Sequence, residues 1–241
     1  MYDLESIIKK DNYRLLCDAG AELEKYFKTV IRLDDQFVYA IGEVPMCIVA
    51  HVDTVRDPGV PVNLKWKNGV VRNENGILGS DDRAGVYAIF QILSKCKWRP
   101  SVLLTNYEEC GGLGMKTFVE SGHWVGRDRL FIALDRMACD QYVFYGRISR
   151  DVMLYVERFG YDRHIGTFSD VLYLTRYYGV PHVNLSIGYY NQHTKNEILV
   201  VSHMEKNINR VIKMIENPIS KNYTDPLFYL KGCVYGKYRV S

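Results

Sequence analysis

The stretch Val102-Leu-Leu-Thr-Asn-Tyr-Glu108-Glu109-Cys-Gly-Gly-Leu-Gly114 decides the interpretation of the fold. Its apolar start is typical of a buried strand, and the strand stops at two adjacent carboxylates and a glycine-rich turn. Neighbouring side chains on an extended chain point in opposite directions, so Glu108 and Glu109 are predicted to have different roles. One could bind a cation while the other stays free to move a proton. Alone, such a pair is more often solvated on the surface.

Further apolar strands are predicted at 46–50, 130–134 and 180–186. The first ends in His51-Val-Asp53, where an HxD pair is either a surface pair or a metal-binding imidazole held by a carboxylate. The second ends at Asp135, and the third runs into an exposed loop that carries His193. Strand ends with polar side chains therefore recur along the chain.

A helix predicted from Ser80 to about Lys95 opens with Asp81 and Asp82. An acidic pair at a helix start is usually a capping pair. Capping can occupy one carboxylate and leave the other directed across the sheet edge. Asp81 is therefore a candidate metal ligand that lies at the start of a helix rather than at the end of a strand.

The remaining pattern predicts hairpins at 29–41 and 62–72 and helices at 4–27, 115–120, 151–159 and 204–216. A further helix is predicted to end at Gly179, with Ser169 or Asp170 as its N-cap. Strands that alternate with helices predict an α/β fold: a three-layer, doubly wound, mostly parallel mixed sheet with helices on both faces. We expect one catalytic domain over 1–241, with 218–241 as an aromatic and basic C-terminal extension that packs on the domain or on a partner.

Composition narrows the function classes. The chain has 241 residues, 47% of them hydrophobic and 24% charged, with a net charge of +3 from scattered basic residues. This argues against a nucleic-acid partner. We also expect no membrane partner, because no apolar run approaches spanning length. The six cysteines form no CxxC pair and the N-terminus lacks a signal-peptide pattern, so the sequence predicts reduced thiols and a cytoplasmic location.

Ligands of doubly wound sheets bind beyond the carboxyl ends of the strands. Several carboxylates and two imidazoles gathered there would repel or sit desolvated unless a cation compensated them. Mixed His and Asp/Glu without cysteine suits zinc, with manganese or cobalt as alternatives, and is too rich in nitrogen for calcium. Five ligands with one shared carboxylate can hold two ions about 3.5–4 Å apart.

The order of these residues over positions 46–197 resembles the co-catalytic zinc exopeptidases of peptidase clan MH, and within them the single-domain aminopeptidase-like branch. Glu197 looks like that family's usual follow-on to the last histidine. The interval from Asp135 to His193 is too short for the lid or dimerisation domain of on the order of 100 residues that related branches carry. The resemblance implies the zinc-dependent exopeptidase (phosphorylase/hydrolase-like) fold.

The resemblance also implies roles for the candidate residues. It assigns one zinc ion to His51 and Asp135, the second to Glu109 and His193, and makes Asp81 the bridge, with a cis peptide bond between Asp81 and Asp82. Catalytic roles fall to Asp53, which would orient His51, and to Glu108, the general base that takes a proton from water and delivers it to the leaving amine. Candidates for contacting substrate are Asp170, Tyr189, Tyr190 and Arg147.

Three hypotheses follow. The first is a dinuclear zinc aminopeptidase, a zinc-dependent metallo-exopeptidase that removes N-terminal residues from peptides. The second is a related amidohydrolase or carboxypeptidase-like deacylase that acts on small N-acyl compounds. The third is a catalytically inactive metal-binding module, against which an intact Glu108 argues. The sequence leaves the residue preference and the oligomeric state open. The other histidines (His123, His164, His182, His203) are interpreted as structural or surface residues.

Overall fold

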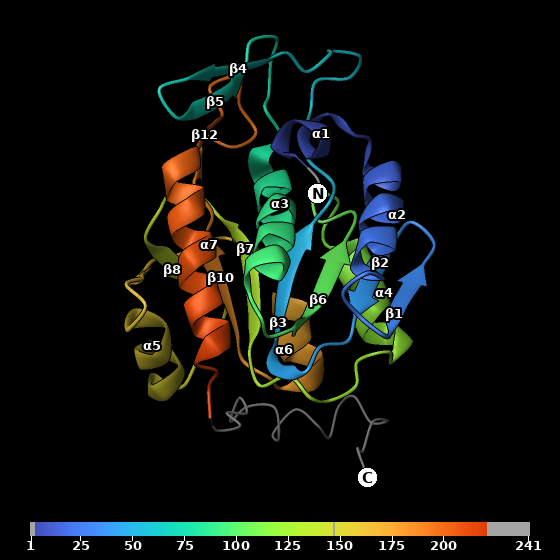
Figure 1. The fold of residues 1–241 in the computed structure, drawn as a ribbon, viewed down its shortest axis with the longest axis vertical. Helices are drawn as coiled ribbons and strands as arrows, with labels where there is room; N and C mark the ends of the chain where they lie inside the picture. The colour runs from blue at the N-terminus through green and yellow to red at the C-terminus, as the bar shows by residue number, and fades with distance from the viewer. Residues whose placement is uncertain (1–2, 147, 221–241) are drawn as a thin grey trace.

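An eight-stranded mixed sheet forms the centre of the protein (Figure 1), in the strand order β1-β2-β6-β3-β7-β10-β8-β9. The structure is a computed structural model, and it describes residues 3–146 and 148–220. The strands are β1 (Val30–Leu33), β2 (Phe37–Ala40), β3 (Val44–His51), β6 (Pro100–Thr105), β7 (Phe131–Arg136), β8 (Gln141–Val143), β9 (Asp162–Arg163) and β10 (His182–Ser186). The four central strands β6, β3, β7 and β10 are parallel, whereas β2 and β8 pair antiparallel at their flanks.

Helices cover both faces of this sheet, which confirms the predicted three-layer α/β fold. They are α1 (Leu4–Lys9), α2 (Asn12–Leu23), α3 (Ser80–Lys95), α4 (Leu113–Ser121), α5 (Arg150–Glu157), α6 (Leu172–Tyr178) and α7 (Val201–Glu216). Apolar residues of α1, α2, α3, α5 and α7 form one core cluster, and residues of α4 and α6 form a second cluster behind the sheet (Figure 1).

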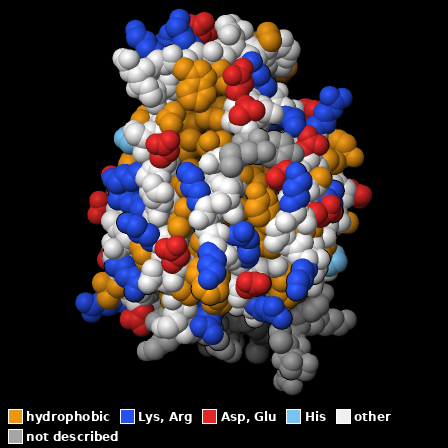
Figure 2. All heavy atoms as spheres, viewed as in Figure 1, with side chains coloured by type: hydrophobic (Ala, Val, Ile, Leu, Met, Phe, Trp, Pro, Cys, Tyr) orange, Lys and Arg blue, Asp and Glu red, His pale blue; other side chains and the backbone are white. Residues whose placement is uncertain are grey.

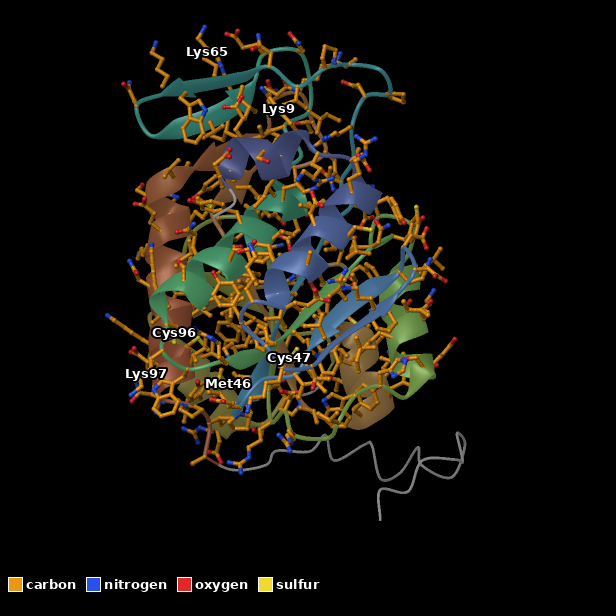
Figure 3. The ribbon with its side chains drawn as sticks, turned by 45° about the vertical axis from the view of Figure 1, so that its right-hand side comes forward. Lys9, Met46, Cys47, Lys65, Cys96 and Lys97 are labelled. Carbon is orange, nitrogen blue, oxygen red and sulfur yellow. The ribbon has the colours of Figure 1, made fainter. Side chains whose placement is uncertain are left out.

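Strand β3 shows why these strands are continuously apolar. Ile48 and Ala50 pack into the first cluster, while Cys47 and Val49 pack into the second. Successive side chains alternate between two buried faces, so every position needs an apolar residue. Met46 and Cys47 mark the amino-terminal part of β3, at the lower end of the sheet in Figure 3, and β3 runs upward from there.

A second, four-stranded antiparallel sheet lies beyond the carboxyl ends of the central strands, in the order β11-β12-β5-β4. It joins the predicted hairpin, β4 (Leu64–Lys67) and β5 (Val70–Asn73), to β11 (Tyr189–Tyr190) and β12 (Ile198–Val200). The hairpin is the uppermost part of Figure 1 and carries Lys65 in Figure 3. The sequence predicted only a loop between β10 and α7, because strands of two and three residues leave no periodic signal.

The predicted N-cap of α6 is wrong, although the helix ends at Gly179 as expected. The N-cap residue is Val171, and no side chain caps the helix. Ser169 and Asp170 are occupied elsewhere, since Ser169 donates to Asp135 Oδ2 and Asp170 accepts from Thr105. Capping residues can thus be diverted to a neighbouring site.

Charged side chains of both signs are interspersed over the face shown in Figure 2. The five cysteines within the described ranges are all free thiols, and Cys233 lies outside those ranges. Among the described residues, no helix combines the length and apolar character that a membrane span requires. Most of the predicted C-terminal extension, from 221 to 241, also lies outside the described residues.

Candidate metal centre

The predicted ligands converge where the central parallel strands end, the upper edge of the large sheet in Figure 1. His51 is the last residue of β3, and Asp135 is the penultimate residue of β7. The turn after β6, the start of α3 and the loop between β11 and β12 supply the rest. The side chains that come together are His51, Asp81, Glu108, Glu109, Asp135 and His193.

Asp81 stands between two groups of possible ligands. On one side, His51 Nε2 lies 3.2 Å from Asp81 Oδ1 and 3.4 Å from Asp135 Oδ1. On the other side, His193 Nε2 lies 3.3 Å from Asp81 Oδ2 and 2.8 Å from Glu109 Oε1. The two oxygens of one carboxylate therefore face two different imidazoles, each accompanied by a second carboxylate.

These separations fit divalent cations. Ligands bound to zinc tetrahedrally at about 2.0–2.2 Å lie about 3.4 Å from one another, close to the His51 and Asp81 separations above. Asp81 Oδ1 is also a buried atom that lacks a hydrogen-bond partner among the described residues. A buried carboxylate oxygen normally has a hydrogen-bond partner, so this unpartnered oxygen at the centre of the cluster fits a cation ligand.

Asp81 is held by its neighbours on both sides. The Asp81–Asp82 peptide bond is cis, as the resemblance implied. Glu197, only 1% exposed, accepts hydrogen bonds from the backbone N–H groups of Gly79, Ser80 and Asp81 and from the Ser80 hydroxyl, at 2.6–3.1 Å. The loop after His193 thus fixes the segment that delivers the bridging carboxylate.

Asp53 organises both His51 and the glutamate pair. Its backbone carbonyl lies 3.0 Å from His51 Nδ1, and its carboxylate accepts from the N–H groups of Glu108 and Glu109 at 3.1 and 3.0 Å. The donor at Nδ1 leaves Nε2 free to face the acidic cluster. Asp53 is therefore placed to orient His51, although the closer contact is made by its carbonyl rather than by its carboxylate.

Glu108 and Glu109 do not point in opposite directions, although the sequence predicted that they would, because a ligand atom of each lies within 4.8 Å of the other and of His51. Both carboxylates line one cleft, because these residues lie in a turn that begins after Tyr107, whose φ is 64°. Gly114 completes this turn: a Cβ there would lie 2.3 Å from Asn106 O and 2.4 Å from Gln36 O. Only glycine can approach those carbonyls so closely.

Sequence reasoning missed two polar residues that hold Asp135. Asn184 accepts from the Asp135 N–H at 3.0 Å and donates to its carbonyl at 3.1 Å, and Ser169 donates to Oδ2 at 3.2 Å. Asn184 sits within the apolar strand β10 and is 1% exposed. A lone amide in a buried strand is a usable signal, since it needs a specific partner.

Burial disfavours the charged form of several carboxylates in this cluster. It raises the pKa of Glu108 to about 9 and also raises the pKa values of Glu109 and Asp135. Asp81 and Glu109, by contrast, raise the pKa of the His193 imidazole to about 9. Glu108, Glu109 and Asp135 are thus pushed towards protonation and the imidazoles towards the cationic form. Asp81 is the exception, because burial is outweighed by its contacts with His193 and His51, which lower its pKa. Charges of both signs shift in the direction expected of an acidic site that favours a cation.

The cluster of candidate ligands opens into a cleft of about 300 Å³ that Glu108 lines together with Tyr145, Phe168 and Tyr189. Glu108 faces this space, whereas Glu109 forms a hydrogen bond with His193. Tyr189 donates from its hydroxyl to the Asp135 carbonyl at 3.0 Å. A reacting group could therefore lie between Glu108 and the ligand cluster.

The other predicted substrate contacts are placed differently. Tyr190 follows Tyr189 in β11 and points the other way, so its hydroxyl meets His203 Nδ1 at 2.8 Å and lines a separate pocket. Asp170 is 3% exposed and bonded to Thr105, and burial raises its pKa to about 7. Arg147 lies outside the described residues.

Comparisons with known proteins identify the fold. No protein-family model and no curated protein matches the sequence. Among solved structures, aminopeptidase PepT from Bacillus cereus has a TM-score of 0.67 at 15% identity, covering 87% of this chain and 93% of its own. Aminopeptidase APDkam598 from Desulfurococcus kamchatkensis has a TM-score of 0.69 at 12% identity, covering 89% and 94%.

A protein from Bacteroides vulgatus proposed to be a zinc-dependent exopeptidase has a TM-score of 0.58 at 13% identity and covers 86% of each chain. At such identities the likeness concerns the fold alone, and it confirms that this chain shares its α/β fold with these proteins.

Proposed function

We propose that the protein is a dinuclear zinc aminopeptidase that hydrolyses the N-terminal peptide bond of peptides. The observation that carries this proposal is the bridging position of Asp81, whose two oxygens lie 3.2 and 3.3 Å from the imidazoles of His51 and His193. The peptidase names of proteins with the same fold support it.

Each candidate ligand has a place in this proposal. His51 and Asp135 would hold one zinc ion, Glu109 and His193 would hold the other, and Asp81 lies within reach of both groups. Two zinc ions in such a site polarise a scissile carbonyl and lower the pKa of water. Other residues of the protein position these ligands: Asp53 fixes His51 and the turn after β6, and Asn184 fixes Asp135.

Glu108 is the proposed general base. It lines the cleft beside the ligand cluster and is not needed to complete either group of ligands around Asp81. Its carboxylate would take a proton from the attacking water and deliver it to the leaving amine. Bound cations favour the ionised carboxylate and so oppose the upward shift that burial gives its pKa.

Metal analysis combined with hydrolysis assays tests this function. We expect about two zinc ions per chain and release of the N-terminal residue from aminoacyl amides. Chelation should remove the zinc and abolish the hydrolysis. N-acyl substrates, which lack a free amine, separate the aminopeptidase from a deacylase.

The matched pair of variants is His193→Ala and His164→Ala, since both residues are exposed histidines but only His193 faces Asp81. The first should lose metal and activity, and the second should keep both. Fewer than one ion per chain in the parent protein would count against the proposal.

A further inference from the structure

The cleft beside the metal centre contains a guanidinium that the proposed mechanism does not use. Arg136 is the last residue of β7, directly after Asp135, and its half-buried side chain lines the cleft. Nε and Nη2 both donate to Gln141 Oε1, at 3.0 and 2.8 Å. The guanidinium is therefore held in one place by a neutral partner.

Among the described residues, no acidic side chain forms an ion pair with Arg136. Four carboxylates line the same cleft, yet within residues 3–146 and 148–220 none of them lies within ion-pair distance of Arg136. Three of them, Asp81, Glu109 and Asp135, lie against the imidazoles of His51 and His193. The fourth, Glu108, faces the cleft. Gln141 uses two of the five guanidinium N–H donors, so others remain available to a ligand in the cleft.

A guanidinium in this setting is suited to a carboxylate. Its planar fork binds carboxylates through paired, charge-assisted hydrogen bonds, and partial burial strengthens them. Arg136 follows the candidate ligand Asp135 directly in the chain. Each residue of an extended peptide spans about 3.3–3.6 Å, so the far end of a short peptide bound at the metal centre would lie within reach of the Arg136 side chain. The cleft volume of about 300 Å³ also suits a small ligand.

We propose that Arg136 binds a carboxylate of the substrate, which makes short peptides with a free C-terminus the preferred substrate class. This inference rests on the proposed peptidase function and deepens it. The zinc ligands and Glu108 act on the N-terminal peptide bond, while Arg136 holds the other end of a di- or tripeptide. Gln141 is a positioning residue, because it acts by fixing the guanidinium.

Binding measurements test this proposal separately from hydrolysis. The protein is the zinc-loaded Glu108→Ala variant, in which turnover is suppressed, and the method is titration calorimetry. The ligands are trialanine, trialanine C-terminal amide, and the amide of Ala-Ala-Asp, which carries its carboxylate on a side chain. The comparison is repeated with Arg136→Gln added, and with Arg163→Gln as the control for loss of an exposed arginine outside the cleft.

We expect trialanine to bind about tenfold to a hundredfold more tightly than its amide, as for a hydrogen bond to a charged group. Arg136→Gln should reduce this ratio to about one, and Arg163→Gln should preserve it. Should Arg136→Gln fail to fold, Arg136→Lys keeps the charge without the fork and should give an intermediate ratio. Tight binding of the Ala-Ala-Asp amide would extend the carboxylate source to acidic side chains.

Equal binding of trialanine and its amide would overturn the proposal, as would a ratio that survives Arg136→Gln. Hydrolysis of trialanine by the parent protein is measured alongside. If the binding ratio behaves as expected but no peptide is hydrolysed, the aminopeptidase function fails while carboxylate recognition by Arg136 stands.

Discussion

Two buried histidines mark opposite ends of the parallel strands, and they have different partners. His51, at the carboxyl end of β3, is 2% exposed, and His182, the first residue of β10, is 3% exposed. His182 Nε2 accepts from the Tyr145 N–H at 2.9 Å, and its Nδ1 lies 2.7 Å from the Thr175 hydroxyl. His51 faces carboxylates instead.

The difference shows that partners, not burial, decide what a buried histidine does. Burial lowers the pKa of His182 to about 3, because both ring nitrogens have neutral partners that suit the neutral imidazole. Burial alone would also lower the pKa of His51, but the neighbouring carboxylates of Asp135, Asp53 and Asp81 raise it. Both ring nitrogens of His182 have neutral hydrogen-bond partners, whereas the carboxylates around His51 require a balancing positive charge.

The largest effect is expected from Asp81→Asn. A neutral amide cannot supply anionic oxygens to both imidazole groups, so zinc content should fall below two ions per chain. kcat/KM for peptide hydrolysis should drop at least about ten-thousandfold, which corresponds to roughly 5.5 kcal/mol of lost transition-state stabilisation. Metal analysis and steady-state kinetics check this. His182→Gln is the control and should retain both ions; equal metal loss in the two variants would remove the contrast between the regions.

Glu108→Gln should separate catalysis from metal binding. The amide keeps the size of the side chain but cannot accept a proton, so kcat should fall about a thousandfold, within the range for loss of a general base. Zinc content should stay at the parent value, because Glu108 completes neither ligand group around Asp81. Normal turnover in this variant would refute the assigned role.

Much of the fold was predictable because it depends on local patterns. Continuous apolar runs predicted β3, β7 and β10, and the three-and-four spacing predicted α2 and α7. The order of β11 and β12 beside the hairpin was not predictable. Such short strands are specified by contacts with β5, far away in the sequence, rather than by their own composition.

The candidate site was predictable as a set of residues but not as a geometry. Strand ends pointed to His51, Asp135 and the glutamate pair, and the structure brings these side chains together. The supporting contacts of Asn184 and Ser169 depend on the register of β10 against β7 and on the loop before α6, which no local pattern encodes. Arg136 was overlooked for the same reason, since only the folded cleft shows that it faces the metal centre.

Glu197→Ala should weaken the metal centre without removing a ligand. The variant loses the acceptor of four hydrogen bonds to the segment Gly79–Asp81, so the bridging carboxylate is held less firmly. We expect zinc affinity to fall about tenfold to a hundredfold, the usual effect of losing a residue that supports a metal ligand. Competition with a chelating dye measures it. Glu197→Gln keeps acceptor oxygen and should recover part of the affinity, while Glu205→Ala, an exposed glutamate of α7, should have no effect.

The smallest effect concerns the pH dependence of stability at His182. Its pKa is about 3 in the folded protein and about 6.5 when unfolded, so between these values the unfolded chain binds more protons. Stability from this group is therefore complete above about pH 6.5 and is lost as the pH falls, by about 1.4 kcal/mol between pH 7.5 and 5.5. Urea unfolding of the parent and of His182→Gln at both pH values measures the difference.

Other groups titrate in the same range, and Asp128 acts in the opposite sense. Burial raises the folded-state pKa of Asp128 to about 6, so its contribution decreases as the pH rises towards that value. Because Asp128 is present in both proteins, it cancels in the difference between the parent and His182→Gln. An equal loss of stability in the two proteins between pH 7.5 and 5.5 would mean that His182 accepts a proton while folded. His182 would then resemble His51 in carrying a proton in the folded protein, contrary to what its neutral hydrogen-bond partners imply.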